Sequence, residues 1–161
     1  IAHTIGARFI RVNVLTESLV TDQGIINGCA HDLMRYRKQL GATDVDIYGD
    51  VRVKHAAPIV PRPVEEIARD MAYRADADAL IATGPHTGTE PDRDQLRRIK
   101  NSVPDRPVLI GSGLTIRNAI RLLGDGDGAI VGTSLKENGI VERPIDEMRV
   151  RELVRVIERL R

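Results

Sequence analysis

Short apolar runs rich in β-branched residues alternate along the chain with longer segments in which apolar residues recur at helical spacing. The first pattern is typical of buried strands and the second of amphipathic helices. The runs predict strands at residues 8–15, 45–55, 79–84, 107–112 and 128–133. The other segments predict helices at residues 29–40, 63–75, 92–103, 115–123 and 146–161. We therefore expect a strand followed by a helix, repeated five times.

Such alternation, with strands that are apolar throughout, predicts a parallel sheet covered by helices. Two α/β architectures are compatible with it. One is an open, doubly wound sheet of five strands. The other is a (β/α)₈ TIM barrel, which needs about 250 residues, so that this chain would supply only strands 4–8.

The positions of the glycines favour the barrel. A dinucleotide-binding sheet carries GxGxxG after its first strand, and nothing similar follows residue 15. Glycine turns instead follow the last two predicted strands, at residues 111–113 and 132–134. Many barrels bind phosphate after strands seven and eight. We therefore predict a single domain over residues 1–161 that forms the last five βα units of a TIM barrel.

The first seven residues resemble the end of a helix, with Gly6 as its C-terminal cap. A chain that starts in this way is expected to lack preceding elements. The strands that begin at Arg8 and Gly128 would then be open sheet edges, which favour pairing with other strands. We accordingly expect either residues before Ile1 or a second copy of the chain to complete the sheet. Because a second copy would pair with the open edges, we also expect a homo-oligomer.

Composition narrows the class of ligand. The 161 residues include 24 Lys and Arg against 23 Asp and Glu, and only 2% are aromatic, which argues against a nucleic-acid-binding surface. A single Cys excludes a disulfide framework, and no metal-ligand spacing is present. The apolar runs are too short for a transmembrane segment. We expect a cytoplasmic protein. The sequence does not indicate which cofactor, if any, the protein uses.

The two glycine turns are the strongest candidate binding site. Small residues let the backbone approach a phosphate closely, and free N–H groups can donate to its oxygens. The alternative is ordinary turn chemistry, because glycine is common after strands. The predicted phosphate-binding residues are Gly111, Ser112, Gly113, Gly132, Thr133 and Ser134.

The end of the second predicted strand carries a group of charges. If the strand continued to residue 55, alternation would place Asp50, Arg52 and Lys54 on one face. Such charges either line a solvated barrel mouth or form an internal salt-bridge cluster. Burial and the carboxylate could shift the pKa of the Lys54 amine. We predict catalytic roles for Asp50, Lys54 and His55, and substrate binding by Arg52.

Other candidates lie near the first strand. Asn13 shares a strand face with Arg11 and could orient a substrate or Asp50, although a polar layer inside the barrel explains it equally well. The polar stretch 16–28 is expected to be a loop, long enough for Asp22 and Gln23 to close over a ligand. Spacing alone favours an ordinary surface loop there.

Several stretches together resemble the BtpA/SgcQ family. They are RFIRVNVL, VTDQGII, DVRVKHAAP, ATGPHTG, VLIGSGLT and GAIVGTSLKENG, in matching order and spacing from Arg8 to Pro144. The resemblance implies a ribulose-phosphate-binding type of TIM barrel, of which this chain is the part from the fourth strand onward. It places Asn13, Asp22, Gln23, Asp50, Lys54, His55, Ser112, Gly113, Gly132, Thr133 and Ser134 on family motif positions. Arg52 departs from the expected pattern, and its positive charge would favour an anionic ligand.

The resemblance also implies two kinds of function. Cyanobacterial members are associated with photosystem I biogenesis, and bacterial and archaeal members with sugar-phosphate or nucleotide chemistry. We therefore expect either an enzyme that acts on a small phosphorylated metabolite, by isomerase, lyase or aldolase chemistry, or a non-catalytic assembly factor. The enzyme predicts polar groups that converge in a pocket, and the assembly factor predicts an exposed apolar patch.

Overall fold

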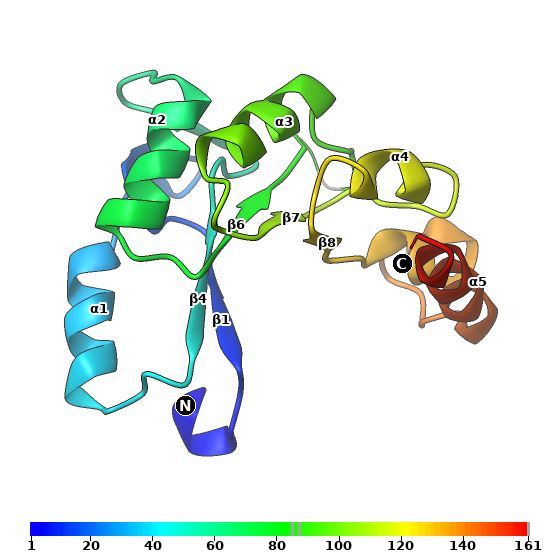
Figure 1. The fold of residues 1–161 in the computed structure, drawn as a ribbon, viewed down its shortest axis with the longest axis horizontal. Coiled ribbons are helices and arrows are strands. Elements are labelled where there is room, and N and C mark those ends of the chain that lie inside the picture. Colours follow the sequence, from blue (N-terminus) through cyan, green and yellow to red (C-terminus); the bar gives the residue numbers. More distant parts are fainter. Residues whose placement is uncertain (85, 87, 161) are drawn as a thin grey trace.

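The computed structural model describes residues 1–84, 86 and 88–160, so that Pro85 and Thr87 of the ATGPHTG stretch, and Arg161, lie outside the described residues. Its main sheet is parallel and has the order β1-β4-β6-β7-β8 (Figure 1). These strands are β1 (Phe9–Val12), β4 (Asp46–Asp50), β6 (Ala79–Ala82), β7 (Val108–Ile110) and β8 (Gly128–Ala129). A doubly wound sheet would reverse its order at a switch point. The sequential order therefore confirms the prediction of a partial barrel.

The helices lie in an arc along one side of this sheet (Figure 1). They are α1 (Ala30–Gln39), α2 (Val64–Arg69), a π-helical turn (Asp70–Arg74), α3 (Arg93–Ser102), α4 (Ala119–Leu123) and α5 (Glu147–Glu158). Short 3₁₀ turns occur at His3–Ile5, Thr133–Leu135 and Glu137–Gly139. Gly6, with a φ of 70°, ends the first of these turns, as the sequence indicated. No helix in the described part of the chain is long and apolar enough to cross a membrane.

The core lies between the sheet and the helices. Ile47, Leu80 and Ile110 point from the strands into a buried cluster that includes Met71 of the π-helical turn and Leu96 of α3. The other face of the sheet carries alternate residues, among which the rings of Phe9 and Tyr48 stack with centroids 4.4 Å apart. Alternation along the strands thus separates a helix-covered face from the face that would line a barrel.

Side-chain caps fix the starts of two helices. Asp92 accepts a hydrogen bond from the Gln95 N–H at 2.7 Å, and Asp146 accepts one from the Met148 N–H at 2.9 Å. The helix expected from residue 115 begins only at Ala119. The reason is that the Asn118 side chain accepts the Thr115 N–H at 2.7 Å and holds residues 115–118 in a turn.

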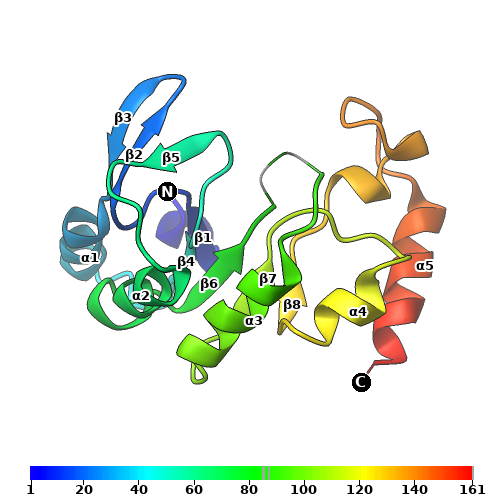
Figure 2. The same ribbon diagram turned by 90° about the horizontal axis from the view of Figure 1, so that it is seen from above.

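The stretch 16–28, predicted to be a loop, is a β-hairpin. Strands β2 (Ser18–Thr21) and β3 (Gly24–Asn27) pair antiparallel, and β5 (Ala56–Pro58) adds to β2 on its other side. The Thr21 hydroxyl stabilises the tight turn by donating to the Gly24 carbonyl at 2.9 Å. Figure 2 shows this small sheet next to the ends of β1 and β4.

The predicted strand 45–55 is also corrected, because β4 ends at Asp50. The Val51 N–H still donates to the Ile81 carbonyl at 2.9 Å, but the chain then leaves the sheet towards β5. The Thr83 hydroxyl donates to the Arg52 carbonyl at 2.8 Å and fixes this departure. Asp50, Arg52 and Lys54 therefore do not share one strand face.

Candidate functional site

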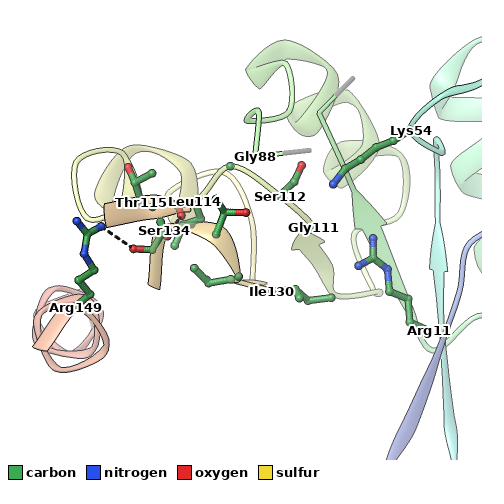
Figure 3. A pocket seen from close by; sticks show the side chains of 15 residues that line it. Arg11, Lys54, Gly88, Gly111, Ser112, Leu114, Thr115, Ile130, Ser134 and Arg149 are labelled. Atoms are coloured by element: carbon green, nitrogen blue, oxygen red, sulfur yellow. Dashed lines mark hydrogen bonds between the residues drawn. The ribbon is translucent and has the colours of Figure 1, made fainter. Parts of the chain in front are cut away.

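A cavity of about 480 Å³ opens at the carboxyl ends of the parallel strands (Figure 3). We call it the main cavity. All six residues predicted to bind phosphate line it, so the structure brings both glycine turns to one place. Arg11 and Lys54 line its other side, and Arg149 of α5 lies beside the second turn. Three cationic side chains and no carboxylate belong to its lining among the described residues.

The first turn, 111–113, is tightly packed. The buried Ser112 hydroxyl accepts the Gly84 N–H at 2.9 Å and donates to the Thr89 carbonyl at 2.8 Å. A Cβ on Gly113 would overlap the backbone of Thr89 and Glu90, and φ there is +71°. A Cβ on Gly111 would overlap the Ile81 side chain. Packing alone therefore requires both Gly111 and Gly113. The hydroxyl hydrogen of Ser112 is already donated to the Thr89 carbonyl and is not available to a ligand.

The second turn, 132–134, is open. A Cβ on Gly132 would meet no other described atom within 4 Å. The Ser134 hydroxyl donates to the Leu114 carbonyl at 2.7 Å. Within the described residues, no hydrogen bond uses the N–H groups of Gly113 or Gly132. Backbone donors, rather than the two serine hydroxyls, are thus available to a bound anion.

Arg149 is a functional candidate that sequence reasoning missed. Arg149 lies in the first turn of α5 and lines the main cavity. Its Nη1 donates to the Ser134 carbonyl at 3.2 Å (Figure 3). Its Nε lies 3.5 Å from the Asp146 carboxylate. Its position in the sequence could have indicated this role. Arg149 comes three residues after the helix cap Asp146, in the first turn of α5, which lies beside the turn 132–134.

An ion pair between Arg11 and the buried Asp50 forms the other end of the main cavity. Arg11 Nε and Nη2 each donate to one oxygen of Asp50, both at 2.9 Å, and the Asp50 side chain is only 4% exposed. Burial raises the pKa of the Asp50 carboxyl, against the opposing effect of Arg11. Arg11, rather than the predicted Asn13, therefore orients Asp50. Bidentate geometry of this kind holds both groups in place.

Lys54 points into the main cavity from the segment after β4 (Figure 3). Burial lowers the pKa of its amine, and the neighbouring Arg11 guanidinium lowers it further, while Asp50 has the opposite effect. No hydrogen bond or ion pair of the Lys54 amine occurs among the described residues. A partly buried amine with a lowered pKa is suited to proton transfer.

A second cavity, of about 290 Å³, lies on the Asp50 side of the ion pair. Asn13, Glu17 and Arg52 line it together with Asp50, and we call it the Glu17 cavity. Arg11 lines the main cavity and Asp50 the Glu17 cavity, so their ion pair is a shared wall. Glu17 was not a candidate in the sequence, because Asp22 and Gln23 were the residues of the predicted loop 16–28 that were expected to reach a ligand.

Three of the predicted residues lie elsewhere. Asp22 and Gln23 form the exposed turn between β2 and β3 and line neither cavity. His55 is exposed, has a left-handed φ of 54°, and places its ring 5.8 Å from that of His86. It lines neither cavity. The described residues contain no cluster of three His, Cys, Asp or Glu side chains.

Comparison with known proteins identifies the family. The sequence model of the BtpA family matches residues 1–159. The chain belongs to the BtpA family. It is 43% identical over 150 residues to the photosystem I biogenesis protein BtpA of Synechocystis, an alignment that covers 93% of this chain and 52% of that protein. It is also 43% identical to an uncharacterised protein of Pyrococcus furiosus, over 97% of this chain and 58% of that protein. This BtpA-family chain thus spans little more than half the length of these relatives.

Solved structures give the fold. A Schiff-base-forming fructose-1,6-bisphosphate aldolase matches with a TM-score of 0.61 and 14% identity, over 99% of this chain and 61% of the aldolase. The phosphoribosyl anthranilate isomerase of Thermococcus kodakaraensis matches with a TM-score of 0.56 and 17% identity, over 97% of this chain and 66% of the isomerase. At these identities the likeness establishes a TIM-barrel fold for the BtpA-family chain. It does not establish a reaction, which has to be argued from the residues of the site.

Proposed function

We propose that the main cavity binds the phosphate group of a small phosphorylated metabolite. The carrying observation is the open Gly132 turn: Gly132 lines a cavity that three cationic side chains also line, and its N–H has no partner in the described part of the chain. Backbone N–H groups of both turns would donate to the phosphate oxygens, with Arg149 supplying charge. The rest of the ligand would extend towards Arg11 and Lys54.

The cavity also supports an enzyme rather than an assembly factor. Polar groups converge in a recess at the strand ends, where barrel enzymes carry their catalytic residues. Lys54 would move a proton to or from the bound molecule. Asp50, which is buried and fully engaged with Arg11, would act as a positioning residue for that guanidinium. Isomerase, lyase and aldolase reactions all need such a proton transfer, and the solved neighbours include aldolases and an isomerase.

A ligand screen followed by calorimetry tests this proposal. Differential scanning fluorimetry against sugar phosphates and nucleotides would find a ligand, which is then titrated into the parent and into Gly132→Val. Bulk at residue 132 would occupy the space of the phosphate, so binding should weaken at least about tenfold, or ~1.4 kcal/mol. A folded Gly132→Val protein that binds as tightly as the parent would show that the assignment is wrong.

Lys54→Ala separates binding from turnover. It should retain affinity for inorganic phosphate, because the phosphate lies on the glycine turns, but lose conversion of the phosphorylated ligand. Lys38→Ala is the matched control, since Lys38 is an exposed lysine of α1 that lines neither the main cavity nor the Glu17 cavity. Full turnover by Lys54→Ala would exclude the proton-transfer role.

A further inference from the structure

The main cavity carries positive side chains at two separate ends. Arg149 lies beside the open Gly132 turn, whereas Arg11 and Lys54 lie on the opposite side of the cavity (Figure 3). The other described residues of the lining are glycines, aliphatic residues, serines and threonines, which carry no charge. Every charged side chain in the described lining is therefore a cation, and only one of the two ends is used by the phosphate of the proposed function.

The Arg11 guanidinium is held in place and still has unused donors. Its Nε and Nη2 each donate to one oxygen of the buried Asp50 carboxylate at 2.9 Å. A guanidinium has N–H groups on all three of its nitrogens, and no hydrogen bond of Arg11 Nη1 occurs within the described residues. The side chain lines the main cavity and is 32% exposed. A guanidinium fixed in this way is suited to bind a carboxylate or a phosphate without first having to be ordered.

Lys54 adds a positive charge that no carboxylate of the described chain neutralises. Arg11 is paired with Asp50, and the Arg149 Nε lies 3.5 Å from the Asp146 carboxylate. Lys54, by contrast, forms no ion pair with any described residue. Burial lowers the pKa of the Lys54 amine, and repulsion from the Arg11 guanidinium lowers it further. An anion bound beside these two cationic side chains would offset that repulsion.

We infer that the Arg11 and Lys54 end of the main cavity binds a second anionic group of the ligand, either a carboxylate or a second phosphoryl group. The inference rests on the proposed function, because the first phosphate would occupy the Gly132 end of the same cavity. A volume of about 480 Å³ is typical of small-molecule sites and leaves room for a carbon chain between the two anions. The substrate class is then a phosphorylated acid or a bisphosphate, and not a nucleoside monophosphate, whose far end is an uncharged base.

Calorimetry with pairs of probes that differ at one end tests the inference. The first pair is 6-phosphogluconate and sorbitol 6-phosphate, which share the phosphate and the carbon chain but end in a carboxylate and a hydroxymethyl group, respectively. The second pair is fructose 1,6-bisphosphate and fructose 6-phosphate. In at least one pair the doubly anionic probe should bind the parent protein about tenfold more tightly or better, as expected for a hydrogen bond between charged groups. The pair that shows this preference identifies the second anion as a carboxylate or a phosphoryl group.

Variants of Lys54 locate the second anion in the cavity. Lys54→Met removes the charge and should reduce the preference about fivefold or more, while the affinity for the singly anionic probe stays unchanged. Lys54→Arg keeps a cation and should retain the preference. Lys38→Met, at an exposed position of α1 outside the main cavity, is the control for loss of a lysine. Arg11 is kept in all of these proteins, because its removal would leave the buried Asp50 carboxylate unpaired.

The outcomes separate the two ideas. If the parent binds neither inorganic phosphate nor any probe, or if a folded Gly132→Val protein binds inorganic phosphate normally, the proposed function fails and the inference fails with it. If phosphate binding depends on Gly132 but the two probes of each pair bind equally well, only the inference fails. The same holds if Lys54→Met keeps the full preference, because the second anion then does not lie at Lys54. Should Lys54→Met not fold, Lys54→Gln takes its place and is judged by the same criterion.

Discussion

The turn after β7 and the turn after β8 are similar in sequence, but they use their glycines differently. In the first, 111–113, side chains and backbone from neighbouring segments occupy the space that a Cβ would need. In the second, 132–134, the space beside Gly132 is empty and opens to the main cavity. One glycine turn is therefore required by the folded structure itself. The other is free of that requirement, and this makes it the more informative indication of a ligand.

The difference arises from what covers each strand end. Gly84, Thr89 and Glu90 pack against the first turn, where the Ser112 hydroxyl bridges Gly84 and Thr89. Glu90 is itself held by Arg121, at 2.8 and 2.9 Å, and this ion pair lowers the pKa of the Glu90 carboxyl. The second turn follows β8, the last strand of the sheet, and Arg149 of α5 lies against it by donating to the Ser134 carbonyl.

Gly113→Ala should have the largest effect on stability. The new methyl group would overlap the backbone of Thr89 and Glu90, and the residue would keep a left-handed φ. The strain and the overlap together should lower the free energy of unfolding by about 3 kcal/mol or more. Urea denaturation followed by circular dichroism measures this change. A loss below about 1 kcal/mol would mean that Thr89 and Glu90 do not pack on this turn as described.

Ser112→Ala should come next, with Ser134→Ala as its counterpart in the open turn. Removal of the Ser112 hydroxyl leaves a buried N–H and a carbonyl without partners, so we expect a loss of about 2 kcal/mol. Ser134 makes one hydrogen bond to the Leu114 carbonyl, so its loss should be about 1 kcal/mol. Equal losses in the same denaturation experiment would remove the distinction between the two turns.

The sequence predicted the fold better than the site, for a physical reason. Strand–helix alternation and turn glycines are local signals, and they were sufficient for the parallel order and the family resemblance. The pairing of Arg11 with Asp50, the reach of Arg149 and the Glu17 cavity depend on contacts between segments distant in sequence. The strand end at Asp50 was missed because alternation continues through Val51 and Val53 after the backbone has left the sheet.

The hairpin was missed although its sequence signal is local. The polar residues of the stretch 16–28 were interpreted as a loop. Residues 18–21 and 24–27 are short β-rich runs around a two-residue turn, a pattern that predicts a hairpin. Polar residues at its ends favoured a loop, and that interpretation directed attention to Asp22 and Gln23 at the tip. The residue that the hairpin positions at a cavity is Glu17, at its base.

Gly132→Ala should have the smallest effect on stability and is the sharpest test of the comparison. The added methyl group meets no described atom within 4 Å, so the free energy of unfolding should change by no more than about 0.5 kcal/mol. The same methyl group would project beside the N–H that we propose as a phosphate donor, so phosphate affinity should fall measurably while stability does not. Denaturation and phosphate titration on one protein sample read both quantities. If Gly132→Ala destabilises the protein as strongly as Gly113→Ala, both turns are structural, because the glycine at residue 132 would then be needed for the fold and not for access to the backbone.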